Sequence, residues 1–494
     1  MYILSIDQST QGTKALLFDE TGEMVARADH PHRQIITKEG WVEHDLKEIL
    51  CNVYQVCREV VEKAGVSPAK VKAVGISNQR ETTAAWDRKT GEPACHAIVW
   101  QCARAEEIAR NLKEYGNKIQ KSTGLPLSPY FSAAKKAWMT ENVERVKELL
   151  REERLCFGTI DSWLLFHLTE EHVHATDYSN ASRTQLFSLE KLEWDEEICG
   201  LFGIPLKTLP QVRMSDSCFG YTTLDGFLPE PVPICGVLGD SHGALFGQNC
   251  RKRGQLKATY GTGSSVMVNT GEKPIFSEKG IVTSIAWGRN GKVSYVLEGN
   301  LNYTGAVISW LKDEVQLITS AAETEALARQ ANPSDTCYLV PAFTGLGAPY
   351  WKPSVRGMLT GISRTTGKNE IVRAGLDCIA YQITDLLHLM QEEMGYPLEE
   401  MKADGGPAQN AYLMQFQSDM AGIKVSLPPV QELSGMGAAF LAGISCGLYQ
   451  EEIIFGKIVY NKYVPKMERQ EAESRYGGWQ QAVKQACSCE KQQS

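Results

Sequence analysis

Two distant stretches of the chain share one pattern, in which two strands are joined by a turn rich in Gly, Thr and Ser. Residues 2–6 (YILSI) predict a buried strand, and residues 13–27 contain two apolar runs around Asp-Glu-Thr-Gly-Glu, which is a hairpin signal. Residues 256–268 (LKATYGTGSSVMV) again predict a strand, a polar turn and a strand. The recurrence predicts two related domains.

Helical and strand patterns alternate between these stretches. Residues 45–64 carry apolar side chains at spacings of three and four, which predicts an amphipathic helix, and residues 71–77 (VKAVGIS) predict another strand. Such alternation is typical of α/β architecture, and 494 residues exceed what one hydrophobic core organises. We therefore predict an N-terminal domain over 1–250, a C-terminal domain over 251–494 and a ligand-binding cleft between them. The polar tail from about Cys487 is expected to fray.

Composition argues against several classes of protein. The net charge is −8 and the pI about 5.7, so the chain lacks the basic surface of a nucleic-acid-binding protein and no such partner is expected. The fourteen cysteines contain no C-x-x-C spacing, and the first residues lack the basic segment and apolar stretch of a signal peptide. The most apolar stretches are too short to span a bilayer. We expect a cytoplasmic protein with no membrane anchor.

The two polar turns are candidate phosphate-binding sites. Residues 7–14 (DQSTQGTK) offer backbone N–H groups, hydroxyls and an ammonium group in a small volume, and these can surround phosphate oxygens. Residues 260–265 (YGTGSS) have similar chemistry, and neither turn is a Walker A loop. An ordinary hairpin loop is the alternative for the first turn. Because each half of the chain has one such turn, we expect the two turns to bind one polyphosphate from opposite sides.

Three other segments place polar residues after predicted strands. Residues 404–406 (DGG) precede a helix whose N-terminus favours an anion, unless the segment is a plain strand-to-helix turn. Asp240 follows a short apolar run, so it is a candidate general base or a helix N-cap. Arg80 and Glu81 can hold vicinal hydroxyls, or can form a surface ion pair of little energetic value.

Together with further segments, these motifs resemble the FGGY family of carbohydrate kinases. The matching segments span nearly the whole chain and occur in the order typical of that family. They are GWVEHD (40–45), NQRETT (78–83), IVWQCAR (98–104), TDYSNASRTQLF (176–187), YGTGS (260–264), VPAFTGLGAPYW (340–351), DGG (404–406) and LMQFQSD (413–419).

The resemblance implies an α/β protein with two actin/hexokinase-like (ribonuclease H-like) ATPase domains and an interdomain cleft that binds ATP and a small polyol. It implies transfer of the γ-phosphoryl group of ATP, with Mg²⁺, to a terminal hydroxyl. Within the family, the chain is most similar to members that phosphorylate glycerol to glycerol 3-phosphate. The resemblance also suggests a homodimer or homotetramer.

By position, the resemblance assigns roles to individual residues. Asp240 matches the general base, and Asp7 matches the carboxylate that holds Mg²⁺ through water. The substrate-binding positions are Arg80, Glu81, Trp100, Tyr130, Asp240, Ser241 and Ser265. The nucleotide-binding positions are Thr10, Gln11, Gly12, Lys14, Gly261, Thr262, Gly305, Ser309, Gly406 and Asn410.

Four positions depart from the pattern of the glycerol-phosphorylating members. Ser241 replaces a glutamine that contacts glycerol, and Ser265 replaces a phenylalanine that lines the substrate pocket. Lys14 replaces an arginine, which keeps the charge but loses a bidentate contact, and Ser309 replaces a glutamine near the nucleotide. The first two changes predict a roomier, more polar pocket, so a kinase for a tetritol or pentulose is the main alternative. A non-catalytic nucleotide-binding regulator is a third reading, which the candidate base and both phosphate turns disfavour.

Overall fold

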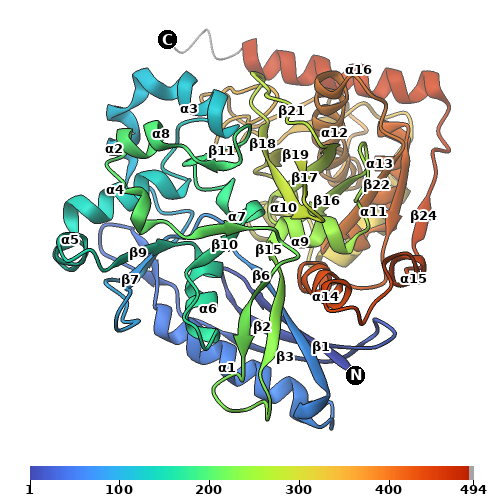
Figure 1. Cartoon of the computed structure of the whole chain (residues 1–494). Helices are drawn as coiled ribbons and strands as arrows, with labels where there is room; N and C mark the ends of the chain where they lie inside the picture. The colour runs from blue at the N-terminus through green and yellow to red at the C-terminus, as the bar shows by residue number, and fades with distance from the viewer. Residues whose placement is uncertain (489–494) are drawn as a thin grey trace.

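The first of two large sheets is built from the N-terminal half of the chain (Figure 1). The computed structural model describes residues 1–488. β1 pairs antiparallel with β2 and parallel with β6, and β6 pairs parallel with β15, so the predicted strands at 2–6 and 71–77 and the predicted hairpin are confirmed. In spatial order the strands are β14 (Cys218–Thr222), β15 (Val232–Gly239), β6 (Val71–Asn78), β1 (Tyr2–Gln8), β2 (Gly12–Asp19) and β3 (Met24–Pro31).

The second sheet repeats this arrangement with strands from the other half. Its central strand pairs antiparallel with the next strand along the chain and parallel with a later one, as β1 does with β2 and β6. Two α/β domains of one architecture are therefore confirmed. In spatial order the strands are β18 (Val282–Arg289), β19 (Lys292–Leu301), β17 (Ser264–Gly271), β16 (Leu256–Tyr260), β22 (Glu400–Gly405), β23 (Lys424–Leu427) and β24 (Asn461–Tyr463).

Helix α1 (Leu46–Lys63) shows why the predicted helices form. The side chain of Asp45 caps it by accepting a hydrogen bond from the Lys47 N–H at 2.8 Å, which satisfies a backbone donor that has no partner within the helix. Its apolar face, which includes Ile49 and Val53, is fully buried and packs with β2 and β3. The capping residue and the apolar spacing together define this helix.

Helices also fill the region between β6 and β15 in sequence and cover the second sheet. The first set is α2 (Glu106–Asn111), α3 (Gly116–Thr123), α4 (Ser132–Asn142), α5 (Glu144–Arg151), α6 (Ile160–Leu168), α7 (Tyr178–Ala181) and α8 (Glu196–Leu201). The second set is α10 (Gly305–Asp313), α11 (Thr324–Gln330), α12 (Lys368–Met394), α13 (Ala411–Ala421), α15 (Glu451–Gly456) and α16 (Arg469–Ser488). The small strands are β4 (Ile35–Ile36), β5 (Val42–His44), β7 (Ala84–Asp87), β8 (Ala97–Ile98), β9 (Leu155–Gly158), β10 (Ala175–Asp177), β11 (Phe187–Ser188), β12 (Glu193–Trp194), β13 (Gln211–Arg213), β20 (Tyr338–Val340) and β21 (Met358–Thr360).

The end of α16 bears on the expected C-terminal tail. Cys487 and Ser488 still belong to the helix, so the start of fraying at Cys487 was placed too early. The rest of that tail, residues 489–494, lies outside the described residues. Over residues 1–488, no helix combines the length and apolar character needed to cross a membrane.

One helix of the second half packs on the first sheet. Helix α14 (Leu433–Ser445) contacts β1, β6 and β15 and lies against α9 (Asp240–Gly247), as Figure 1 shows. A Cβ atom on Gly75 would lie 2.5 Å from the Ala438 carbonyl oxygen, and one on Gly437 would overlap the Gly243 carbonyl. Only glycine allows so close an approach of backbone to backbone. The division at residue 250 remains a proposal, and it leaves this helix on the first domain's sheet.

Candidate active site

The carboxyl ends of parallel strands bring several candidate residues together. In the parallel ladders of the first sheet, Asn78 lies opposite both Gln8 and Gly239. Arg80 and Asp240 follow these partners within two residues. Ligands of α/β proteins bind outside the carboxyl ends of parallel strands, so this edge is the expected place for a reacting group.

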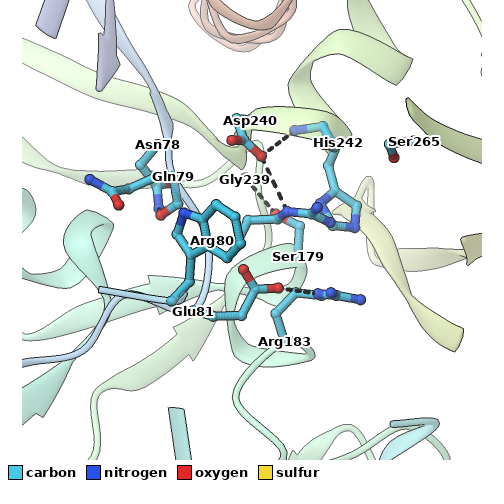
Figure 2. Close-up of polar contacts among 12 residues, drawn as sticks. Asn78, Gln79, Arg80, Glu81, Ser179, Arg183, Gly239, Asp240, His242 and Ser265 are labelled. Atoms are coloured by element: carbon cyan, nitrogen blue, oxygen red, sulfur yellow. Dashed lines mark hydrogen bonds and ion pairs between the residues drawn. The ribbon is translucent and has the colours of Figure 1, made fainter. Parts of the chain in front are cut away.

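Asp240 is the first residue of α9, and Gly239 is the N-cap, so the interpretation of Asp240 as an N-cap is wrong. Its Oδ1 accepts a hydrogen bond from the Ser241 N–H at 2.6 Å and lies 3.2 Å from Nε of Arg80 (Figure 2). The side chain is 37% exposed, which leaves the carboxylate open to a ligand. A carboxylate held in this way can accept a proton from a hydroxyl group.

Arg80 is buried, so the alternative of a weak surface ion pair is wrong. Its two terminal nitrogens donate to the Glu298 carboxylate at 2.9 and 3.0 Å, which is a bidentate contact. Glu298 is fully buried on β19 of the second sheet. Burial would raise its pKa, but Arg80 and Arg183 hold that pKa well below its usual value. The pair therefore joins the two domains beside Asp240.

Arg183 and Glu298 are site residues that the sequence reasoning missed. Nε of Arg183 donates to Glu81 at 2.6 Å, and Nη1 lies 3.1 Å from Glu298 (Figure 2 shows the contact with Glu81). Both residues carried a signal: Arg183 lies within the segment TDYSNASRTQLF, and Glu298 directly follows the apolar run Tyr295-Val296-Leu297 in a strand. A charge in a buried strand needs a partner.

Glu81 has an unusual backbone conformation. Its φ of 62° lies in the left-handed region, which is uncommon for residues other than glycine. Hydroxyls of Ser132 and Thr83 donate to its carbonyl oxygen at 2.9 and 3.0 Å, and these bonds hold the conformation. Such strain is often found at functional sites, and here it orients the Glu81 side chain toward Arg183.

Trp100 and Tyr130 lie beside each other, with ring centroids 5.4 Å apart. The indole N–H of Trp100 donates to Oγ1 of Thr10 at 2.9 Å, so a predicted polyol contact touches a predicted nucleotide contact. The buried ammonium group of Lys135 donates to the carbonyl oxygen of Tyr130 at 2.6 Å and thereby fixes the backbone of that turn. The aromatic pair thus lies next to the first polar turn.

A cavity of about 750 Å³ lies between elements of the second domain. Every residue that lines it comes from the second half of the chain. The structure brings together here six of the predicted nucleotide-binding residues, namely Gly261, Thr262, Gly305, Ser309, Gly406 and Asn410. A cavity of this size suits a nucleotide.

A second cavity of about 420 Å³ is lined by both halves of the chain. Gly406 lines both cavities, so they meet there. Asp7, Asp240 and Ser241 contribute from the first half. The residues that face them from the second half include Lys257, Thr259, Asp404 and Glu432. The cavity is therefore part of an interdomain cleft that leads from the larger cavity to Asp240.

Several predicted residues differ in their surroundings from what was expected. Lys14 lines the smaller cavity, but its ammonium group pairs with Glu432 at 2.6 Å. Gln11 is exposed at the tip of the β1–β2 hairpin. Within residues 1–488, the residues that line the two cavities do not include Thr10, Gln11 or Gly12.

Asp7 is the residue predicted to lie near a metal ion. Burial raises its pKa to about 6, with Asp240 and Glu432 adding to the effect and Lys14 opposing it. A cation beside this carboxyl would favour its ionised form, so the surroundings fit a divalent ion. In the described part of the chain, no group of three or more His, Cys, Asp or Glu is arranged to hold a metal. Mg²⁺ would depend on phosphate oxygens and water for most of its ligands.

Gly239→Ala is expected to displace Arg80, because a Cβ atom at Gly239 would lie 2.8 Å from Cγ of Arg80 and 3.2 Å from Nδ1 of His242. We expect a loss of about 1–3 kcal/mol in the free energy of unfolding, with a raised KM for the polyol that the motifs predict as substrate. Thermal unfolding and steady-state kinetics measure both effects. Gly200→Ala is the control, since a Cβ atom there meets no described heavy atom within 4 Å. Equal behaviour of the two variants would contradict the prediction.

Both halves of the chain match domains of one known family. Residues 2–247 match the N-terminal domain, and residues 256–446 the C-terminal domain, of the FGGY family of carbohydrate kinases. The chain belongs to this family, as the motifs predicted. It is therefore an ATP-dependent kinase that transfers a phosphoryl group to an alcohol.

Within the family, several similar proteins carry one name. The chain is 47% identical to "Glycerol kinase 1" of Thermotoga maritima, over 98% of this chain and 99% of that protein. It is 45% identical to "Glycerol kinase" of Caldanaerobacter subterraneus subsp. tengcongensis, over 98% of both chains. The structure superimposes on the crystal structure of Plasmodium falciparum glycerol kinase with ADP with a TM-score of 0.93, 35% identity and coverage of 98% of both chains.

Proposed function

We propose that this kinase phosphorylates a terminal hydroxyl of glycerol to give glycerol 3-phosphate, with Asp240 as the general base. The observation that carries the proposal is the position of Asp240, which lines the cavity that adjoins the nucleotide cavity and lies 3.2 Å from Arg80. The identity of 47% to a relative named glycerol kinase supports glycerol as the alcohol.

The reaction follows from the positions of these groups. As the glycerol oxygen attacks the γ-phosphorus of ATP, its proton passes to the Asp240 carboxylate, a new O–P bond forms, and the bond from phosphorus to the β-phosphate oxygen breaks to release ADP. Arg80, Glu81, Trp100 and Tyr130 orient the alcohol in this proposal. A Mg²⁺ ion bound with ATP near Asp7 would neutralise part of the phosphate charge. Closure of the cleft would exclude water.

The assignment of roles to the two domains has separate support. The larger cavity is lined by the second half alone, which supports nucleotide binding by residues 251–494. Asp240, Arg80 and Glu81 come from residues 1–250, which supports alcohol binding and proton transfer by that domain. A homodimer or homotetramer remains a prediction, which sedimentation in solution would test.

A substrate panel tests the proposal. Glycerol, a tetritol, a pentulose and other small polyols are offered with Mg²⁺ and ATP, ADP release is measured, and the product is identified by mass spectrometry. We expect glycerol to give the highest kcat/KM. A higher kcat/KM with a longer compound would reject glycerol as the preferred substrate, and ADP release that no alcohol stimulates would reject the kinase assignment.

One observation favours a longer substrate as the second candidate. The hydroxyl of Ser265 donates to Glu298 at 3.4 Å, and Asn300, its partner across the β17–β19 ladder, reaches the same oxygen at 3.5 Å. Ser265 and Asn300 therefore present polar groups at the side of the site where the resemblance implied an aromatic ring. Each hydrogen bond to an additional substrate hydroxyl would contribute about 0.5–1.5 kcal/mol.

Ser241→Gln combined with Ser265→Phe separates the two candidates. If the polar side of the site binds a longer substrate, the double variant improves kcat/KM for glycerol and lowers it for the tetritol or pentulose, with a relative change of roughly tenfold. The two single variants, measured on the same panel, show which position is responsible. An unchanged ranking of substrates would mean that these serines do not set substrate length.

A further inference from the structure

Lys257 is a buried lysine in the wall of the smaller cavity. It lies on β16 and is 1% exposed. Its ammonium group donates to Oγ1 of Thr259 at 2.9 Å. Among residues 1–488, no carboxylate oxygen lies within 4.0 Å of this nitrogen. Lys257 is thus a buried cation without a contacting anion.

Such a group is costly to bury. Lysine is rarely fully buried unless it is paired. A buried ammonium group without a counter-ion loses its hydration, and no ion pair compensates for that loss. The carboxylates of Asp404, Glu298 and Asp240 attract Lys257 from beyond contact distance, while burial lowers its pKa. An anion that enters the cavity would provide the missing contact.

The second lysine that lines this cavity is already paired. Lys14 binds Glu432 at 2.6 Å, and Glu432 also binds Arg27 at 2.6 Å. Arg80, close by, is held by Glu298. Of the cations that the structure describes around this cavity, Lys257 is therefore the one without a contacting carboxylate.

The position of Lys257 indicates which anion it meets. The nucleotide cavity and the smaller cavity meet at Gly406, and Asp240 and Lys257 both line the smaller one. A triphosphate that extends past Gly406 would place its last phosphoryl group between Asp240 and Lys257. The α- and β-phosphates would lie nearer to Gly406.

We propose that Lys257 binds the γ-phosphoryl group of ATP and stabilises the charge on its oxygens during transfer. The ammonium group donates hydrogen bonds to these oxygens and keeps its own protons. Preorganised charge in a site shielded from water is the main source of catalysis in phosphoryl transfer. The proposal rests on the ATP-dependent activity and is independent of which alcohol is phosphorylated.

Lys257→Met and Lys257→Gln test the proposal, with Lys402→Gln as the matched control. Lys402 lies opposite Lys257 in the β16–β22 ladder, but its ammonium group lies 3.6 Å from the centre of the Tyr460 ring. We expect kcat to fall by about 10²–10³-fold in both Lys257 variants. Without alcohol, affinity for a non-hydrolysable ATP analogue with Mg²⁺ should fall about tenfold or more, and affinity for ADP by less than about twofold. Calorimetric titration measures both affinities.

Thermal unfolding separates this role from a structural one. Met is similar in length to Lys and carries no charge, so the melting temperature of Lys257→Met should be equal to that of the wild type or higher. A lower melting temperature together with an equal loss of affinity for ADP and the ATP analogue would overturn the proposal, as would unchanged kcat. Because nucleotide binding is measured without alcohol, a wrong choice of alcohol cannot produce or hide the result.

Discussion

Replacing Asp240 by asparagine is expected to lower kcat by about 10²–10⁴-fold, the usual range for a positioned general base. Asn has nearly the same shape but cannot accept the proton of the attacking hydroxyl. Its side chain can still accept the hydrogen bond from the Ser241 N–H, so the start of α9 should remain intact. Steady-state kinetics with glycerol and calorimetric titration with ATP measure the two parts of this expectation.

The control for this variant is Asp195→Asn. Asp195 is the N-cap of α8 and accepts a hydrogen bond from the Ile198 N–H at 3.1 Å, a role that Asn fills equally well. We expect this control to keep normal turnover. If Asp240→Asn also kept a turnover near that of the wild type, Asp240 would only stabilise the first turn of α9 and would not be the general base.

Replacing Glu298 by glutamine is expected to lower the free energy of unfolding by about 3–5 kcal/mol, because it leaves two buried arginines without their shared counter-ion. Arg80 and Arg183 contact Glu298 and are 8% and 1% exposed. The KM for the alcohol should rise, since Arg80 loses its bidentate partner. Denaturant unfolding of both proteins gives the difference in stability.

The pH dependence of this difference has a definite sign. The pKa of Glu298 in the folded state is held well below its ordinary value of 4.5 by Arg80 and Arg183, against the effect of burial. Its contribution to stability is therefore complete above about pH 4.5 and is lost as the pH falls through the folded-state pKa. The difference between wild type and Glu298→Gln should be constant from neutral pH to about 5 and should shrink below that. A difference that grows on acidification would contradict the ion-pair explanation.

The parts of this protein that depend on local pattern could be predicted from sequence. The apolar run before Asp240 and the strand before Asn78 placed both residues at strand ends, where the structure has them. Glycine-rich segments near Gly261 and Gly406 predicted sites for phosphate or another anion, and both glycines line the larger cavity. These inferences needed only the apolar runs that mark strands and the composition of the turns that follow them.

Contacts between distant segments could not be predicted in this way. Arg80 and Glu298 are 218 positions apart and lie on different sheets, so no local spacing relates them. Without that partner, Arg80 was interpreted as a possible surface residue. The role proposed for Lys257 could not be predicted either. It follows from the lack of a contacting carboxylate, and only the folded structure shows which groups surround this lysine.

The packing of α14 on the first sheet affects the order in which this protein can fold during synthesis. The sheet is built from strands that end at Gly239, but one of its faces is covered by a helix that begins at Leu433. At about 5–20 residues per second, a ribosome needs roughly ten to forty seconds to make the intervening segment. Throughout that time the apolar face around Gly75 is open to other chains. Nascent chains of this kinase should therefore need chaperone protection until α14 has emerged, and a fragment that ends near residue 250 should aggregate.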